Sequence, residues 1–225
     1  MADRAEFIES IRHRTRTGKY KPTHAPDVAW TVREGPRESE PIEDPPARFL
    51  QELEALGGHG KRAASLDEAR EYVVSLARER DAKVLLRWDV EELEELGVDG
   101  PLAEAGVEVV VWRDLDDFRE ISARADVGLS SAEWAVAETG SLVLESGPGK
   151  GRSVTLLPPT YVAVLPAERV LRTVHEAIEK YASGGAGGLP ANVCLHTGPS
   201  RSGDIEMEIF VGMHGPGDVH VVLVG

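Results

Sequence analysis

The sequence predicts an α/β protein with a Rossmann-like mixed β-sheet flanked by helices. From residue 47 onward, apolar residues at helical spacing alternate with short apolar runs, the pattern of helices and buried strands in turn. Apolar and polar residues then alternate over 205–211, and a second apolar run, 219–224, follows a glycine-rich turn. We therefore expect the last two segments to form a C-terminal β-hairpin.

The N-terminal part is predicted to lie outside this core. A helical apolar stripe occurs within 3–14, whereas 15–47 holds six prolines, many charges and few apolar side chains. Such a segment cannot bury a core of its own, so it is expected to be an extended arm. The predicted domains are the N-terminal helix and proline-rich arm, 1–46, and the α/β domain, 47–225.

Capping residues and breaks set the expected boundaries. Ser65 with Glu68, and Ser130 with Glu133, have the spacing of a capping box, and Asp89 precedes an apolar stripe. Helices are expected over 46–56, 65–81, 90–96, 114–123, 130–136 and 166–181. Buried strands are expected over 83–88, 107–112, 141–144, 161–165 and 192–195.

Composition excludes several classes of function. The formal net charge of -14 opposes a phosphate backbone, so no nucleic-acid partner is expected. The sequence contains no run of 18 apolar residues and no signal-peptide pattern, so we expect a cytoplasmic protein without membrane insertion. A single cysteine, Cys194, excludes an internal disulfide and a self-contained four-thiolate cluster. Its apolar neighbours favour a buried, inert thiol.

A glycine-rich loop provides a candidate anion site. Gly147, Gly149 and Gly151 allow backbone conformations that turn amides toward an anion, and Lys150 and Arg152 add positive charge. The two cations favour a small carboxylate or phosphate ligand. A hairpin that needs glycine for its backbone conformation is the alternative interpretation.

Five motifs in order resemble the LUD-domain family, and within it the lactate utilisation protein C group. The resemblance covers roughly the last 180 residues. The motifs are Ala-Glu-Thr-Gly-Ser at 137–141, Ser-Gly-Pro-Gly-Lys-Gly-Arg at 146–152, Leu-Leu-Pro-Pro at 156–159, Gly-Pro-Ser-Arg-Ser-Gly-Asp-Ile-Glu at 198–206 and His-Gly-Pro-Gly-Asp-Val-His at 214–220. At 129–131 and 202–203 this sequence has small residues where the family commonly has other small residues. These differences affect the expected ligand specificity and leave the expected fold unchanged.

The resemblance implies a fold like that of sugar-phosphate isomerases and coenzyme A transferases. It also implies a role in oxidation of L-lactate to pyruvate together with iron–sulfur partner subunits. This chain would then contain no cofactor, and the clusters would lie only in the partners. A non-redox subunit with a ligand cleft or an assembly surface is one expected function. An acyl-transfer or isomerase-type enzyme is the other.

Glu138 has two interpretations. The related transferases use a glutamate as acyl acceptor, which would make Glu138 catalytic; alternatively, its carboxylate accepts backbone amides at a turn. Thr139 and Ser141 add hydroxyl groups beside it. Further along, Arg201, after Ser200, is a candidate clamp for a ligand carboxylate, with a surface arginine as the alternative.

We predict no metal site. His214, Asp218 and His220 flank a turn near the C-terminus, but three ligands from different faces of a hairpin have poor geometry for one ion. A turn histidine and a strand histidine are the preferred interpretation.

Overall fold

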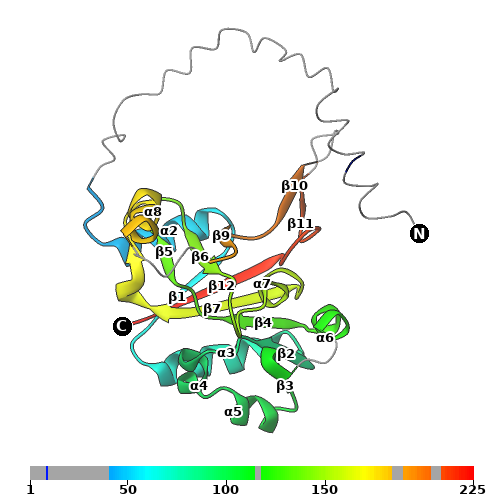
Figure 1. The fold of residues 1–225 in the computed structure, drawn as a ribbon. Helices are drawn as coiled ribbons and strands as arrows, with labels where there is room; N and C mark the ends of the chain where they lie inside the picture. Colours follow the sequence, from blue (N-terminus) through cyan, green and yellow to red (C-terminus); the bar gives the residue numbers. More distant parts are fainter. Residues whose placement is uncertain (1–8, 10–40, 115–117, 184–189, 204–208) are drawn as a thin grey trace. The chain divides into compact units, whose positions relative to one another are not determined.

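The computed structural model describes residues 9, 41–114, 118–183, 190–203 and 209–225 (Figure 1). The predicted N-terminal helix and the arm up to residue 40 therefore lie outside the described residues, apart from Glu9, as do 204–208 of the predicted alternating strand. Residues 41–225 form one unit, and the fold below is that of this unit.

A six-stranded sheet forms its centre, and every neighbouring pair of strands is parallel. Most of its strand residues are buried, as expected for a parallel sheet covered on both faces. The strands, in spatial order, are β1 (His59–Ala63), β12 (Asp218–Val224), β7 (Thr160–Pro166), β4 (Val127–Ser130), β2 (Val84–Arg87) and β3 (Glu108–Val111).

The order of these strands changes direction at one point of the sheet. Along the chain, β2 is followed by β3 on one side and then by β4 on its other side. The carboxyl ends of β2 and β4 thus form the topological switch point, where ligands bind in open parallel sheets.

A second sheet has four strands and is mixed. Its order is β8 (Val170–Leu171), β5 (Trp134–Val136), β6 (Ser141–Glu145) and β9 (Val193–Thr197). The first pair is parallel and the other two pairs are antiparallel. The ring of His196 on β9 stacks on Tyr161 of β7, with centroids 5.0 Å apart, and so connects the two sheets.

A third pair of strands forms a separate hairpin. Strands β10 (Arg201–Gly203) and β11 (Ile209–Val211) are antiparallel and project from the rest of the unit (Figure 1).

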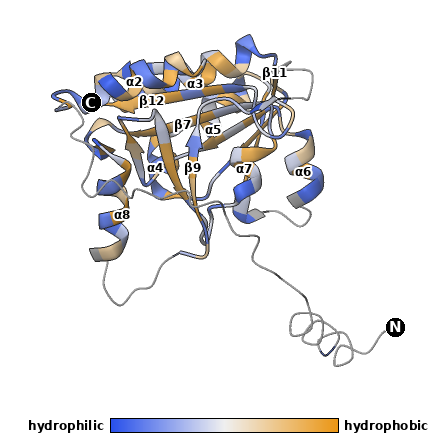
Figure 2. Cartoon of the chain, turned by 90° about the horizontal axis from the view of Figure 1, so that it is seen from above, coloured by the Kyte–Doolittle hydropathy of each residue, from blue (hydrophilic) through white to orange (hydrophobic). Residues whose placement is uncertain are grey.

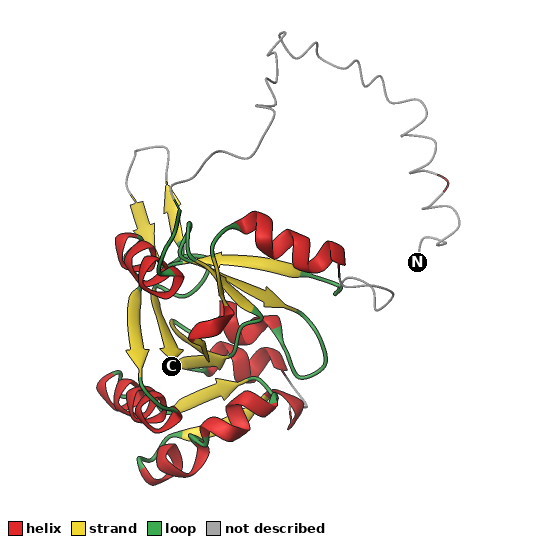
Figure 3. Ribbon diagram, turned by 90° about the vertical axis from the view of Figure 1, so that its left-hand side faces the viewer, coloured by secondary structure: helices red, strands yellow, loops and turns green. Residues whose placement is uncertain are grey.

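Helices cover both faces of the parallel sheet. Helices α2 and α3 lie on one side of β12 and β7, and α6 and α7 on the other, each with apolar residues toward the sheet (Figure 2). Figure 3 marks the helices in red beside the yellow strands. The helices are α2 (Pro45–Ala55), α3 (Leu66–Glu79), α4 (Glu91–Leu96), α5 (Asp99–Glu104), α6 (Phe118–Arg124), α7 (Arg152–Leu156) and α8 (Val174–Ser183), with 3-10 turns η1 (Trp112–Asp114) and η2 (Ala167–Arg169).

Several local predictions are confirmed. Ser65 Oγ accepts a hydrogen bond from the Glu68 amide (3.2 Å) and precedes α3, while Glu68 Oε2 accepts one from the Ala64 amide (2.8 Å). Gly97 ends α4 in the left-handed conformation with φ 66°. At these places the signals are contained within four or five residues, so local chemistry decides the outcome.

Three helix predictions need correction. The capping-box spacing of Ser130 and Glu133 does not start a helix, because 127–130 and 134–136 are strands. The helix expected from Pro166 begins only at Val174, after a 3-10 turn and the short strand β8. Asp89 precedes α4 but does not cap it, since the N-cap is Val90 and has no side-chain cap.

The predicted sheet also needs correction. Residues 218–224 are not half of a C-terminal hairpin: β12 is an interior strand of the parallel sheet, between β1 and β7. The partner of β11 is β10. The central sheet is therefore entirely parallel, and the antiparallel pairs lie in the four-stranded mixed sheet and in the β10–β11 pair.

Candidate functional site

The predicted glycine loop, 147–152, lies against the carboxyl ends of β2 and β4. The Asp89 amide donates to the Gly149 carbonyl (3.0 Å), and Trp88 Nε1 donates to the Gly151 carbonyl (2.9 Å). Gly149 has φ +74°, and a Cβ there would lie 2.3 Å from the Asp89 carbonyl oxygen. Both backbone conformation and packing therefore require glycine at this position. We call this region the carboxyl-edge site.

Charged side chains of both signs surround this loop. Lys150 pairs with Glu133, just after β4, and its Nζ lies 6.0 Å from the centre of the Trp88 ring. The two charged side chains are 23% and 28% exposed, so the pair is accessible from solvent. Arg113 forms an ion pair with Asp89 (3.1 Å).

The cations at this edge lower the pKa of a nearby carboxylate, that of Glu92. Burial alone raises the pKa of Glu92, but a backbone hydrogen bond, the hydrogen bond from Arg169 and the charge of Lys150 outweigh it. The pKa of Glu92 therefore lies below its usual value. The carboxyl-edge site therefore brings cations and carboxylates together at the switch point, and its Lys150–Glu133 pair is partly exposed.

The side chain of Glu138, which follows β5 in the chain, contacts the start of α8. Its Oε1 accepts a hydrogen bond from the Val174 amide (2.6 Å). This contact is the one expected from the turn interpretation and satisfies one of the free amides of a helix N-terminus. Thr139 Oγ1 and Ser141 Oγ are 2.8 Å apart, and Ser141 Oγ continues to Thr197 Oγ1 at 2.7 Å. The two predicted hydroxyl groups thus belong to a hydroxyl chain between β6 and β9.

The remaining predicted residues have other partners. Arg201 Nη2 donates to the Leu56 carbonyl at the end of α2. The Ser200 amide donates to the Pro216 carbonyl (2.9 Å), which connects two loops. Arg152 is exposed and begins α7.

The structure therefore divides the predicted set. Strand β6, with about 3.3 Å per residue, runs between Ser141 and the glycine loop and separates them by roughly 13 Å. Gly147, Gly149, Lys150 and Gly151 lie in one loop, and Arg152 follows it as the first residue of α7. The other predicted residues have contacts elsewhere: Glu138, Thr139, Ser141, Ser200 and Arg201.

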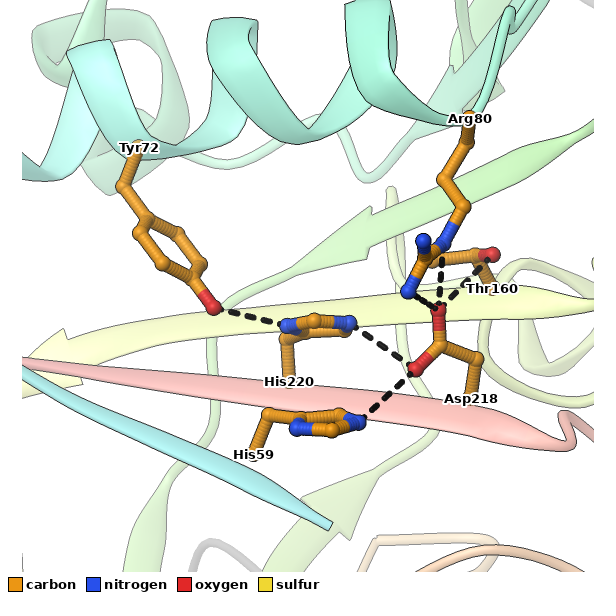
Figure 4. A network of polar contacts seen from close by, with 6 residues as sticks. All are labelled: His59, Tyr72, Arg80, Thr160, Asp218 and His220. Carbon is orange, nitrogen blue, oxygen red and sulfur yellow. Dashed lines mark hydrogen bonds and ion pairs between the residues drawn. The ribbon is translucent and has the colours of Figure 1, made fainter.

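A polar cluster lies at the opposite, amino end of the same sheet (Figure 4). His59 on β1 is the register partner of His220 on β12, and their rings stack with centroids 4.6 Å apart. Asp218 Oδ1 lies 2.9 Å from His220 Nε2 and 3.4 Å from His59 Nε2. Together with Tyr72 and Arg80 of the adjoining helix, these residues form what we call the amino-edge cluster.

Helix α3 and its C-cap fix the outer atoms of this cluster. Tyr72 Oη lies 2.7 Å from His220 Nδ1, and Arg80 contacts Asp218 Oδ2 through Nε (2.8 Å) and Nη2 (2.7 Å). Burial lowers the pKa of His220, which outweighs the opposite effect of Asp218. Burial raises the pKa of Asp218, but His220 and Arg80 outweigh it, so this pKa lies below its usual value.

This cluster was not predicted, because its members are far apart in the chain. Asp218 and His220 were considered only together with His214, which is exposed. Two residues apart on a strand, Asp218 and His220 share one face, and that signal was available. The pairing of β1 with β12, which adds His59, was not visible in any local pattern.

Comparisons with known proteins agree on the family. The family model for the LUD domain matches residues 46–224. A lactate utilisation protein C from Halalkalibacterium halodurans is 34% identical over 159 residues, which cover 69% of this chain and 68% of that protein. Another, from Geobacillus sp. strain WCH70, is 30% identical over 239 residues, covering 95% of this chain and 92% of that one.

A solved structure supports the fold. The crystal structure of a DUF162 family protein from Deinococcus radiodurans matches with a TM-score of 0.59 and 19% identity, over 82% of this chain and 100% of that one. At this identity the likeness concerns the fold alone. Within the described part of the chain, no helix combines the length and apolar character that a membrane span requires.

Proposed function

The chain belongs to the LUD domain family, and we propose that it is a non-redox subunit of an iron–sulfur system that oxidises L-lactate to pyruvate. Its similarity to lactate utilisation proteins C over almost its whole length supports a role in lactate utilisation. One cysteine cannot supply four thiolate ligands, so iron–sulfur partner subunits would bind the clusters and this chain would bind none. A cytoplasmic location is part of this proposal.

The observation that carries the proposed ligand site is the position of Lys150. Its ammonium group lies at the switch point, pairs with the partly exposed Glu133 and lies beside the Trp88 ring. A small 2-hydroxy or 2-oxo acid can offer its own carboxylate to Lys150 in place of Glu133. Of the residues predicted to bind ligand, the proposal keeps the glycine loop with Lys150 and Arg152.

The relation to sugar-phosphate isomerases and coenzyme A transferases also stays a proposal. A parallel sheet covered by helices is compatible with it. An acyl-transfer role for Glu138 gains no support from its contact with the Val174 amide, because that contact accounts for the carboxylate structurally.

Calorimetry with lactate, pyruvate and phosphate tests the ligand site. Lys150→Gln removes the ammonium group and should weaken binding of the preferred carboxylate by roughly 1.5–3 kcal/mol, the range for a hydrogen bond to a charged group. Lys83→Gln is the matched control, because Lys83 is also paired with one carboxylate, Asp81, but precedes β2 at the other edge of the sheet. Equal binding by wild type and Lys150→Gln would contradict the site.

Affinity purification tests the assembly separately. A tagged copy of the chain, expressed in cells growing on lactate, should retain proteins that contain iron–sulfur clusters, whereas the isolated chain should contain no iron. Recovery of the tagged chain without iron–sulfur proteins at low salt would contradict the subunit role and leave the ligand test unaffected.

A further inference from the structure

We propose that His59, Asp218 and His220 form a site for a divalent transition-metal ion of the zinc type, at the amino edge of the parallel sheet. This inference is independent of the proposed role in lactate oxidation. Its ligands are His59 Nε2, His220 Nε2 and Asp218 Oδ1, which all lie within 4.8 Å of one another. Figure 4 shows the Nε2 atoms of both histidines directed toward Asp218 Oδ1.

The spacing of the ligand atoms suits a tetrahedral ion. Zinc bound at about 2.0–2.1 Å by nitrogen and oxygen places neighbouring ligand atoms roughly 3.3 Å apart. The two histidine nitrogens lie 2.9 Å and 3.4 Å from Asp218 Oδ1. The side chain of His59 is 56% exposed, so it can rotate to adjust the third spacing without disturbing the core.

The outer contacts prepare two of the three ligands. Metal binding at His220 Nε2 requires the proton on Nδ1, and Tyr72 Oη, 2.7 Å away, can accept that hydrogen bond. Arg80 occupies Asp218 Oδ2 and leaves Oδ1 directed toward the histidines. Neighbours of this kind fix the orientation of metal-binding side chains.

The donor atoms indicate the class of metal. Two imidazoles and one carboxylate oxygen favour zinc and similar transition metals over magnesium or calcium, which prefer oxygen ligands. Arg80 offsets the negative charge of Asp218 and weakens the attraction for such hard cations further. Three protein ligands leave a fourth position of a tetrahedral ion for a water molecule, and the exposure of His59 gives solvent access to the cluster.

Zinc titration against a chromophoric zinc chelator tests the site on the full chain, after metal removal. The wild type should bind one zinc ion tightly, and cobalt(II) in its place should give the intense visible absorption of a tetrahedral site. His59→Gln removes one ligand and should weaken zinc binding by at least about 10-fold, since even the loss of a residue that orients a ligand has an effect of this size. It should also remove that absorption. Because His59 is largely exposed, this variant should fold normally, which its circular dichroism can verify.

His175→Gln is the matched control. His175 is also exposed and also lies beside a carboxylate, that of Glu179 (3.2 Å), but it is on α8. Its zinc affinity should equal that of the wild type. The proposal is overturned if the wild type binds no zinc, if His59→Gln binds with wild-type affinity, or if both variants lose affinity equally.

Discussion

The two ends of the parallel sheet are built in different ways. At the carboxyl edge, the backbone carbonyls of Gly149 and Gly151 position the glycine loop, by accepting from the Asp89 amide and from Trp88 Nε1. At the amino edge, side chains position one another: Tyr72 and Asp218 contact His220, and Arg80 contacts Asp218. The carboxyl edge therefore depends on the shape of the backbone, and the amino edge depends on the identity of its side chains.

This difference predicts which substitutions affect each edge. A change that leaves all functional groups intact but alters the backbone should disrupt the carboxyl edge. A change that removes one polar atom and keeps the backbone should affect the amino edge. The difference also separates two kinds of site, because a loop can rearrange around a ligand whereas side chains on a strand are already in place.

The largest expected effect is that of Gly149→Ala. The new methyl group would meet the Asp89 carbonyl oxygen at 2.3 Å, in a backbone conformation that alanine rarely adopts. The overlap and the conformational strain together should lower the free energy of unfolding by about 4 kcal/mol. Urea denaturation measures it, with Gly147→Ala as control, because no atom lies within 4 Å of the corresponding position there. Equal stability of the two variants would contradict the packing role of Gly149.

The second prediction concerns pH and a histidine outside both edges. Burial lowers the pKa of His196 to about 4, and among the described residues its Nδ1 has no hydrogen-bond partner. In the unfolded chain His196 therefore becomes protonated near pH 6.5, whereas in the folded chain it becomes protonated only near pH 4. Between these pH values the proton stabilises only the unfolded chain. The free energy of unfolding is therefore unaffected by His196 protonation above pH 6.5 and decreases as the pH falls toward 4, by up to about 3 kcal/mol.

Urea denaturation at several pH values measures this contribution as the difference between wild type and His196→Gln. The variant should lose less stability than the wild type between pH 6.5 and pH 4. His175→Gln, at an exposed position, should follow the wild type. Parallel curves for wild type and His196→Gln would show that His196 is protonated as readily in the folded protein as in the unfolded one.

These two predictions rest on contacts that sequence patterns did not supply. The spacing of Ser65 and Glu68 predicted the start of α3 correctly, because both partners of that motif lie within four residues. The same spacing at Ser130 and Glu133 predicted a helix where the chain forms strands. Ser130 ends β4, whose residues pair with β2 and β7, and burial between these strands outweighs the local preference.

The candidate sites also depend on contacts between distant parts of the chain, which local sequence patterns do not encode. The glycine loop was predicted from its composition, and its position at the switch point follows from strand order, which no local motif encodes. Arg201 was predicted as a clamp for a ligand carboxylate or, alternatively, as a surface arginine, and its contact with the carbonyl of Leu56, far along the chain, was not visible in any local pattern. The amino-edge cluster needs a parallel pairing between strands separated by most of the domain, so side-chain type alone could not identify it.

A smaller effect is expected for Tyr72→Phe at the amino edge. The substitution removes one hydroxyl group and leaves His220 Nδ1 without its partner at 2.7 Å, while the aromatic ring and the backbone stay in place. Loss of this partly buried hydrogen bond should lower the free energy of unfolding by about 1–2 kcal/mol. Urea denaturation at neutral pH measures the change. Unchanged stability would show that the amino edge does not depend on side-chain identity in the way proposed here.

The smallest effect is expected for Glu138, which lies at neither edge. If its carboxylate serves as the acceptor for the Val174 amide, Glu138→Ala should remove one hydrogen bond and one favourable charge at the start of α8. The expected loss is about 1 kcal/mol of unfolding free energy, the usual cost of deleting a helix cap. Glu179→Ala, on the same helix, has an exposed carboxylate near a histidine and should change stability less. A variant at Glu138 that keeps full stability but loses a measurable acyl-transfer activity would reverse this assignment and make the carboxylate catalytic.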